Sequence, residues 1–395
     1  MDIVVEAVAG IGTASAMMRL LAPLRAKDRP PDFLAVHTSV AHDIELVRAA
    51  AAELGAGALH GGTTCFGVMA CGTVQDAGDS GIGCFAIWDP DGDYGSSLAA
   101  IGSDAFAAGR SAAAAAMTEA GRTGQAPDIV YVSATPGREE EILAGIESVV
   151  GANTPILGGS AADNDLSGGW RLFGDDAIAA DAVVVSALYP SRPVSLAYQC
   201  GFAPTDRSGI VTRAEGRRIM EIDGQPAGEV YQRWTDGAIA MPSAGAKTVL
   251  AESTLYPLGR AAGAVSDIPF YLLVHPAAVS ADGGIDIFAE VGLGERLHLM
   301  SSSVDALTER AGRVVSLAAS RGRLVPGEIA GALMVYCGGR MMTVRDRMHR
   351  VAQDMHRAVD AAPSLGIFTF GEQGPDILGR NRHGNLMLSC LTFSK

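Results

Sequence analysis

Four short segments carry residue types that could bind or transform a ligand. In each, glycines near the end of an apolar run are joined to hydroxyl, carboxylate, imidazole or guanidinium groups. Glycine lets the backbone approach a ligand closely, and the polar groups beside it donate and accept hydrogen bonds. The pattern predicts a small-ligand site, although a tight turn capped by a polar residue also explains each segment. The candidate ligand-binding residues are Thr63, Thr64, Gly158, Gly159, Ser160, Asp163, Gly338, Gly339, Arg340, Glu372 and His383.

Arg340 is the leading candidate for an anion contact. It follows Gly338-Gly339 at the end of an apolar run and precedes a helix expected to begin near Met341. A helix N-terminus offers free N–H groups and a partial positive charge, and a planar guanidinium suits a carboxylate. We therefore expect Arg340 to hold the anionic group of the ligand. Glu372 is expected either to receive an ammonium group or to pair with a nearby arginine.

His60 is the first candidate for an iron or metal ligand, and His37 is the second because it ends a predicted strand. A lone histidine is more often a hydrogen-bonded structural residue, and both interpretations remain open. Cys65 or Cys71 near His60 would instead suit a cysteine-dependent enzyme. The six cysteines form no Cys-x-x-Cys pair, so we expect reduced and mostly buried thiols. The chain contains no dinucleotide or phosphate-loop spacing, no Gly-x-Ser-x-Gly and no His-Glu-x-x-His.

Alternating elements must position these segments. Thr135 is expected to cap a helix that ends at Gly151, and after Arg207 glycine and aspartate turns indicate antiparallel pairing. The predicted class is α/β, a mixed-sheet layered α/β sandwich in two halves, with domains 1–235 and 236–395. The predicted strands are 33–37, 82–88, 129–133, 181–188, 194–200, 268–274, 285–291, 329–337, 366–370 and 386–393, and the main predicted helices are about 11–26, 40–54, 103–120, 135–151, 223–234, 304–319 and 341–361.

One internal similarity links two of the segments. Pro155–Ser160 and Gly366–Glu372 each place an apolar strand before a glycine turn that bears a polar group. Duplication and common strand-turn chemistry both explain this similarity, and we favour the second.

Composition excludes several classes of partner. The chain has 395 residues, of which 48% are apolar and 19% charged, and its net charge is −14. This is a folded, acidic protein, and without a basic cluster we expect no nucleic-acid partner. The sequence opens without a basic signal region and lacks an apolar run of about 18 residues, so we expect no membrane association and a cytoplasmic location.

In combination and linear order, these motifs resemble the FIST family, a two-part sensory module of bacterial signalling proteins. The resemblance covers nearly the whole chain. It departs from the family where relatives have a Gly-Cys-Ser/Thr-Ser/Thr-x-Gly-Glu run, because this chain reads Gly-Gly-Thr-Thr-Cys-Phe-Gly over residues 61–67 and lacks the expected glutamate and cysteine. The matching segments are Gly61–Gly67, Gly158–Asp163, Ala182–Leu188, Gly201, Val211-Thr212 and Glu221–Ala227 in the first part, and Tyr256–Gly259, Val291–Gly294, Gly331-Ala332, Cys337–Arg340, Gly366–Glu372, His383 and Asn385 in the second.

The resemblance implies a non-enzymatic, cytoplasmic sensor that binds an amino-acid-like zwitterion or another small anion. It implies signalling through a separate partner, such as a histidine kinase or a diguanylate cyclase. The alternative within the family is a haem-binding nitric-oxide sensor that regulates a histidine kinase or a cyclic-di-GMP enzyme, with His60 as the ligand to haem. The cysteine-dependent enzyme is the alternative from another class.

Overall fold

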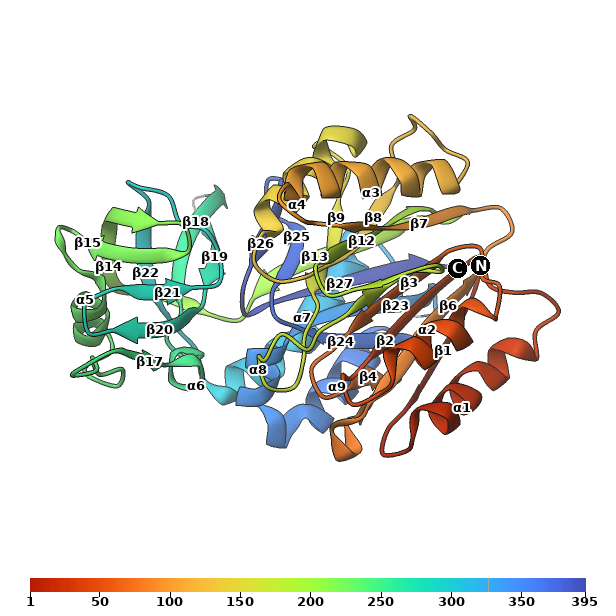
Figure 1. Cartoon of the computed structure of the whole chain (residues 1–395), viewed down its shortest axis with the longest axis horizontal. Coiled ribbons are helices and arrows are strands. Elements are labelled where there is room, and N and C mark those ends of the chain that lie inside the picture. The colour runs from red at the N-terminus through yellow and green to blue at the C-terminus, as the bar shows by residue number, and fades with distance from the viewer. Residues whose placement is uncertain (267, 326) are drawn as a thin grey trace.

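Three six-stranded sheets form the body of the molecule and a fourth sheet forms a separate lobe (Figure 1). The structure is a computed structural model that describes residues 1–266, 268–325 and 327–395. The mixed α/β class is therefore confirmed, with parallel and antiparallel pairs in each body sheet.

The body consists of three repeats with the same order of elements. Each repeat runs strand, helix, strand, helix, strand, then a short hairpin and a last strand. The first repeat contains β1 (Asp2–Val8), α1 (Thr13–Arg25), β2 (Phe33–Thr38), α2 (Ile44–Ala52), β3 (Leu59–Thr63), the hairpin of β4 (Val68–Ala70) and β5 (Thr73–Gln75), the short 3-10 helix Ala77–Asp79 and β6 (Ile82–Trp88).

The second repeat contains β7 (Asp93–Ala100), α3 (Ala105–Glu119), β8 (Ile129–Ala134), α4 (Glu139–Val150), β9 (Ile156–Ser160), the hairpin of β10 (Leu172–Phe173) and β11 (Ile178–Ala179), and β12 (Ala182–Tyr189). The third contains β13 (Val194–Cys200), α7 (Val304–Arg321), β23 (Ile329–Cys337), α8 (Gly338–Thr343), the 3-10 helix Arg345–Arg347, α9 (Met348–Ala358), β24 (Ser364–Thr369), the hairpin of β25 (Glu372–Pro375) and β26 (Asn381–Gly384), and β27 (Met387–Ser394).

The repeats exchange their hairpins in a closed cycle. The sheets have the orders β1-β6-β2-β3-β10-β11, β7-β12-β8-β9-β25-β26 and β13-β27-β23-β24-β4-β5. The first sheet thus takes its hairpin from the second repeat, the second sheet from the third, and the third sheet from the first. Duplication therefore explains the similarity between Pro155–Ser160 and Gly366–Glu372, against our preference, because β9 and β24 are equivalent third strands.

One apolar core joins the three repeats. The inner faces of the three sheets meet around residues such as Phe33, Tyr131 and Val335, all fully buried. On the outside, each sheet is covered by its own pair of helices, α1 with α2, α3 with α4, and α7 with α9. The predicted layering of helices on mixed sheets is thus present, arranged three times around a common centre.

The lobe is an insertion into the third repeat. In the first two repeats four residues separate the first strand from the first helix, whereas β13 ends at Cys200 and α7 begins at Val304. Residues 203–301 fill this gap with an antiparallel sheet and its own apolar core. Its elements are β14 (Ala203–Glu215), β15 (Arg218–Ile222), β16 (Gln225–Pro226), α5 (Ala227–Trp234), β17 (Ala246–Thr248), α6 (Leu250–Ser253), β18 (Leu258–Val265), β19 (Ile268–Val274), β20 (Pro276–Ser280), β21 (Ile285–Ile287) and β22 (Arg296–Ser301).

Three predictions about organisation need correction. A boundary between 235 and 236 falls inside the lobe, directly after α5, because the lobe sheet draws strands from both sides of that position. The helix expected from Thr135 begins at Glu139, since the Thr135 hydroxyl bonds to Ala182 in the neighbouring strand rather than capping a helix. The helix expected over 341–361 is divided into α8, a 3-10 turn and α9. Among the described residues, no helix is long and apolar enough to cross a membrane.

Candidate functional site

The third strands of the three repeats end together at the centre of the body. Their ends are joined by a cyclic set of backbone hydrogen bonds, each from one repeat to the next: Cys65 N to Phe368 O (3.1 Å), Ala162 N to Thr63 O (3.1 Å) and Phe370 N to Ser160 O (3.1 Å). Four of the predicted site segments lie at or next to this centre, because they are equivalent or neighbouring positions of the repeats. The segments that the sequence analysis assigned to a ligand site therefore lie at a junction of the repeats.

The hydroxyl groups at this junction are buried and bonded to protein. Thr64 Oγ1 donates to Gly67 O (2.9 Å) and accepts from Phe368 N (2.8 Å). Thr63 Oγ1 accepts from Arg171 N (3.1 Å). These threonines join segments that are far apart in sequence. The arrangement supports a structural role for both residues.

Gly158 and Gly159 allow strands to pack closely. A Cβ at Gly158 would lie 1.9 Å from Val132 O, and one at Gly159 would lie 2.4 Å from the Thr369 side chain. Both glycines pair with the exchanged strand β25. The fully buried Asp163 accepts hydrogen bonds from the backbone of Leu166, Gly168 and Gly169, so it organises the loop that follows.

Ser160 and His383 belong to a buried network between the body and the lobe. Ser160 Oγ donates to Glu139 Oε1 (2.7 Å), and the His383 ring lies 4.0 Å from that carboxylate. His383 Nε2 donates to Phe288 O of the lobe (3.2 Å), and Nδ1 accepts from Gln373 Nε2 (3.2 Å). The network thus contains members of the second repeat, the third repeat and the lobe.

Glu139 and Arg217 complete this network, and nothing in the sequence pointed to their roles. Arg217 Nη2 of the lobe lies 2.6 Å from Glu139 Oε2 and 2.6 Å from Glu140 Oε2 at the start of α4. Burial alone would raise the pKa of Glu139, but the nearby His383 and Arg217 and the Ser160 hydrogen bond lower it to about 2. No local signal pairs Arg217 with residues 77 and 78 positions earlier. We call Glu139, Glu140 and Arg217 the lobe clasp.

Glu372 is fully buried on the exchanged strand β25. Its carboxyl oxygens accept hydrogen bonds from Thr369 Oγ1 (2.9 Å) and Met387 N (2.9 Å). Burial outweighs these bonds and raises the pKa of Glu372 to about 8. The side chain is therefore largely protonated at neutral pH, and among the described residues no arginine forms an ion pair with it.

Arg340 is buried inside the third repeat. It is the third residue of α8, which has six residues, and its Nη2 donates to Leu307 O (2.8 Å) while Tyr336 lies under the guanidinium at 5.1 Å. The predicted long helix with a free N-terminus is therefore absent at this position. Gly338 approaches Cys65 and Phe370, and Gly339 approaches His275. Among the described residues, the Arg340 side chain thus forms no hydrogen bond or ion pair with Glu372, Ser160 or the other predicted contacts.

His60 does not have the geometry of a haem ligand. Its two ring nitrogens lie 2.8 Å from Ser186 Oγ and 2.8 Å from Ser133 Oγ, deep in the body core. Burial lowers the pKa of His60 well below its usual value, so the ring is neutral and both nitrogens are engaged. His37 is similarly buried and bonds to Tyr131 (2.9 Å). The residues proposed from sequence therefore do not fit haem. Among the described residues, no group of three or more His, Cys, Asp or Glu side chains is placed to hold a metal ion.

Cys65 does not have the properties of a nucleophile. Its thiol is buried, and burial together with the charge of Asp163 raises its pKa to about 12. Cys71 is exposed but lies in the turn between β4 and β5. His60 is fully enclosed in the core and bonded to serines, so it is not placed to serve as a base for either thiol.

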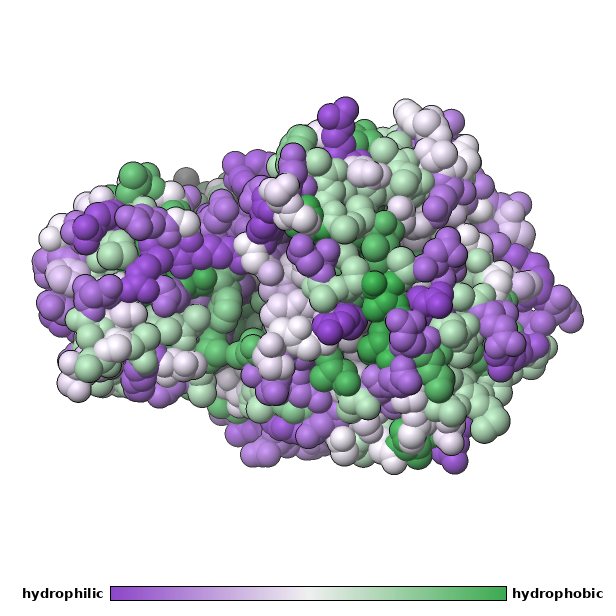
Figure 2. Space-filling view, in the orientation of Figure 1, coloured by the Kyte–Doolittle hydropathy of each residue, from purple (hydrophilic) through white to green (hydrophobic). Residues whose placement is uncertain are grey.

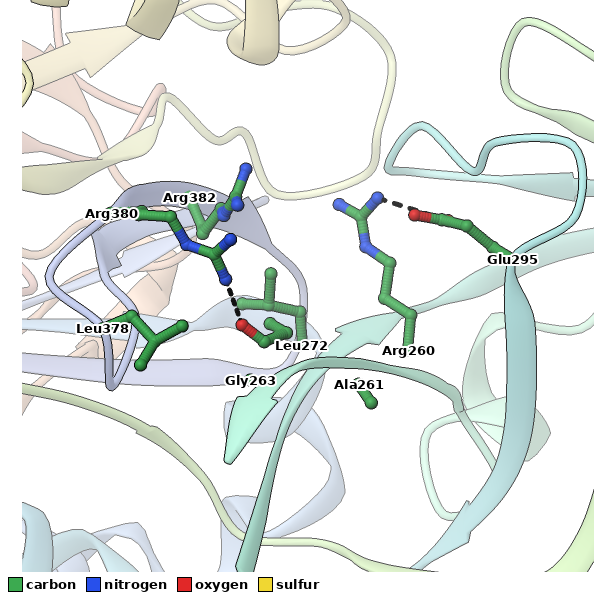
Figure 3. Close-up of a pocket in the computed structure, with 9 residues that line it drawn as sticks. Arg260, Ala261, Gly263, Leu272, Glu295, Leu378, Arg380 and Arg382 are labelled. Carbon is green, nitrogen blue, oxygen red and sulfur yellow. Dashed lines mark hydrogen bonds and ion pairs between the residues drawn. The ribbon is translucent and has the colours of Figure 1, made fainter. Parts of the chain in front are cut away.

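An open cavity lies where the lobe meets the body. Its volume is about 400 Å³. In Figure 3, Arg260 and Glu295 face it from the lobe while Arg380, Arg382 and Leu378 approach from the β25–β26 hairpin. Hydrophilic residues also gather across the upper part of the boundary between lobe and body in Figure 2. We call this cavity the arginine pocket; its lining residues are Arg260, Ala261, Ala262, Gly263, Leu272, Glu295, Leu378, Arg380 and Arg382.

The arginine pocket has an excess of positive charge in an acidic protein. Glu295 lies 3.7 Å from Arg260 Nη1, and the Arg260 Nε is buried without a hydrogen-bond partner among the described residues. Arg380 and Arg382 share one carboxylate, that of the buried Asp376, at 2.8 Å and 3.4 Å. Three guanidinium groups thus share two carboxylates. The spacing of Arg380 and Arg382, two residues apart beside a strand, was the available sequence signal, and it does not reveal Arg260 across the junction.

Comparison with protein families gives two adjacent matches. Residues 32–225 match the FIST N domain, and residues 227–375 match the FIST C domain. Together they cover most of the chain, and the boundary between them falls inside the lobe.

Individual relatives cover smaller parts. Uncharacterized proteins of Mycobacterium bovis and Mycobacterium tuberculosis are each 28% identical over 232 residues, which is 58% of this chain and 58% of theirs. An uncharacterized protein of Methanocaldococcus jannaschii is 34% identical over 100 residues, 25% of this chain and 18% of its own. The matches thus span little more than half of the mycobacterial relatives. Among solved structures, cyanuric acid hydrolase from A. caulinodans aligns over 100% of this chain and 99% of its own, with 10% identity and a TM-score of 0.41.

Proposed function

Because the chain belongs to the FIST family, whose domains are associated with sensory signal transduction, we propose that it senses a small anionic molecule bound in the arginine pocket. The observation that carries this proposal is the position of three arginines around one cavity between two structural units. The family association also favours a non-enzymatic role.

The pocket favours a small carboxylate, including an amino-acid-like zwitterion. Guanidinium groups bind carboxylates through two parallel hydrogen bonds, and such charge-assisted bonds are among the strongest in proteins. Glu295 is half-exposed at the rim and would receive an ammonium group once a ligand carboxylate occupies Arg260. A volume of about 400 Å³ suits a molecule of this size. The anion predicted for Arg340 is therefore assigned to this pocket instead.

Ligand binding would change the position of the lobe relative to the body. Arg260 belongs to the lobe and Arg382 to the third-repeat hairpin, so a ligand that contacts both favours the arrangement that brings them together. A ligand shifts such an equilibrium only by its difference in affinity for the two states, and a bridging ligand has that difference. The lobe connects to the body through two short segments next to Cys200 and Val304, so ligand binding would act against the contacts of the lobe clasp that hold the observed arrangement.

Calorimetric titration with succinate, aspartate, glutamate and inorganic phosphate tests the site. We expect at least one carboxylate to bind, and expect Arg260→Ala and Arg382→Ala each to weaken it about 10- to 100-fold, the usual value of a charge-assisted hydrogen bond. Arg313→Ala is the control, because Arg313 is exposed on α7 and away from the pocket. The proposal is wrong if none of these anions binds, or if the two pocket variants bind as the control does.

The signal would pass to a separate protein, and a histidine kinase or diguanylate cyclase is the partner class that the family suggests. The test is ligand-dependent autophosphorylation or cyclic-di-GMP synthesis by a candidate partner in the presence of this protein. Arg382→Ala should remove the ligand dependence but leave physical association unchanged. A partner response that persists in Arg382→Ala would place the sensory site elsewhere.

A further inference from the structure

A second cationic site lies inside the third repeat, away from the arginine pocket. The Arg340 side chain is completely buried and makes one hydrogen bond, from Nη2 to Leu307 O (2.8 Å). Its Nε and Nη1 atoms have no hydrogen-bond partner among the described residues. An unpartnered buried donor in a native protein requires a specific explanation, such as a bound ion or water.

The charge of Arg340 is not neutralised by the protein around it. A guanidinium does not lose its proton at any ordinary pH, and removing it from water is costly. One carbonyl oxygen and the face of Tyr336 at 5.1 Å offset only part of that cost. Within the described residues Arg340 forms no ion pair with any carboxylate. Glu372 is the buried acid that interacts electrostatically with Arg340, and it is largely protonated, and therefore uncharged, at neutral pH.

Further unpartnered donors lie beside it. A Cβ on Gly201 would lie 3.3 Å from Arg340 Nη2 and 3.3 Å from Arg310 Cγ, so the two arginines flank the same glycine. Arg310 Nε and the Tyr336 hydroxyl are also buried without a partner in the described part of the chain. Elements α7, β23 and α8 thus direct two cations and a hydroxyl to one small region.

We propose that a small monovalent inorganic anion, of the size of chloride or bromide, binds between Arg340, Arg310 and Tyr336. Such an ion accepts several N–H and O–H hydrogen bonds at once and supplies the missing negative charge. The tight packing around Gly201 favours a monatomic ion over an organic acid. The site is independent of the arginine pocket, and it gives Arg340 an anion of a different class from the carboxylate predicted from sequence.

The first test is thermal unfolding of the full chain at constant ionic strength, with gluconate replaced stepwise by chloride or bromide. A bound anion stabilises the folded state by mass action, so a concentration 100 times its Kd should raise the folding equilibrium constant about 100-fold. We expect a saturating rise in Tm that Arg340→Met abolishes. The Arg345→Met variant should retain it, because Arg345 is an exposed arginine of the same segment that pairs with Asp79.

The second test is diffraction from crystals of the unaltered chain grown in bromide. We expect an anomalous peak within hydrogen-bonding distance of Arg340, and this readout does not depend on whether Arg340→Met folds. Water alone at this position, a Tm that is insensitive to halide, or a halide effect that persists in Arg340→Met would each overturn the proposal.

Discussion

Glu372 links stability to pH in an unusual direction for a carboxylic acid. Its pKa is raised by burial from 4.5 to about 8, so the folded protein keeps a proton that the unfolded chain releases near pH 4.5. The contribution of Glu372 protonation to the free energy of unfolding is therefore fully present below pH 4.5 and is lost as the pH rises toward 8. Since one pKa unit corresponds to about 1.4 kcal/mol, this loss is at most about 5 kcal/mol.

The prediction is that Glu372→Gln flattens the pH dependence of stability between pH 5 and 8. Urea unfolding monitored by circular dichroism at several pH values measures it. Glu309→Gln, at an exposed position on α7, should leave the original slope in place. Equal slopes in Glu372→Gln and the parent chain would contradict the assignment.

Gly61 shows that the glycines picked out by sequence serve packing. A Cβ at this position would lie 2.0 Å from the ring of the fully buried Phe173 on the exchanged strand β10. We expect Gly61→Ala to lower the free energy of unfolding by about 1–3 kcal/mol, the usual cost of overpacking a core. Gly12→Ala is the matched control, because a Cβ at Gly12 would have nothing within 4 Å of it. If Gly61→Ala were as stable as Gly12→Ala, β10 and its Phe173 ring would be able to move aside at little cost in free energy.

The residues chosen from sequence were found to be buried and mostly bonded to protein. Their types and spacing predicted that polar side chains gather at one place, and Thr64, Ser160 and Glu372 do lie close to the junction of the repeats. Sequence alone did not distinguish a ligand site from a junction of repeats, because both need glycine for close approach and hydroxyls for hydrogen bonds. The arginine pocket was missed because its residues come from a lobe hairpin and a body hairpin over 100 positions apart.

At the scale of elements, the lobe clasp fixes the lobe against α4. Arg217 lies 2.6 Å from both Glu139 and Glu140, and its side chain is only 18% exposed. Removing one partner of a buried ion pair leaves an uncompensated charge, at a cost of about 3–5 kcal/mol. We expect Arg217→Ala to lower the free energy of unfolding by this amount in urea titrations at pH 7.

A low-pH measurement checks the same element. Because the pKa of Glu139 is lowered to about 2, its contribution is complete above pH 4.5 and is lost as pH falls from 4.5 toward 2. Arg217→Ala should therefore reduce the loss of stability across this acidic range. Arg213→Ala, which removes an exposed pair with Glu221 on the same lobe, should change stability by less than about 1 kcal/mol. Indistinguishable effects of the two variants would show that the clasp does not hold the lobe.

Sequence patterns identified two central strands and one of the three first strands. The predicted strands 82–88 and 329–337 coincide with β6 and β23 inside their sheets, and the predicted strand 194–200 coincides with β13 at a sheet edge. The missed strands β1 and β7 are the first strands of their repeats and form the edges of their sheets. β7 has the sequence DYGSSLAA, which lacks β-branched residues. It forms a strand because it pairs with β12 along its whole length. The first strands of two repeats were missed, and the first strand of the third repeat, β13, is followed by the lobe. The sequence analysis therefore did not reveal that the body contains three repeats.

At the scale of the whole molecule, the exchanged hairpins make the repeats interdependent. Each sheet contains strands of two repeats, and the three sheets share one core. A single repeat would expose the edge that normally receives its neighbour's hairpin. The lobe differs, since its sheet draws only on residues 203–301 and it has its own core. A further apolar cluster, which includes Leu272, Met300 and Met387, joins the lobe to the body.

The cyclic exchange has a consequence for the connectivity of the chain. In Figure 1 the N- and C-terminal labels lie next to each other, and Ile3 touches Gly331, whose strand partner is Phe393. The architecture is therefore a ring of three units that the covalent chain happens to open between the third unit and the first. Which unit comes first carries no structural information.

A circular permutant tests this. A short glycine-serine linker would join Lys395 to Met1, and new ends would be made between Pro90 and Asp91, two exposed residues of the turn that connects the first repeat to the second. We expect this permutant to show the same circular dichroism spectrum and the same free energy of unfolding as the parent. An insoluble or unfolded permutant would mean that the order of the units matters for folding. If the ring is indifferent to its opening, an ancestor of this fold could have assembled from three separate copies of one unit before they were joined in a single chain.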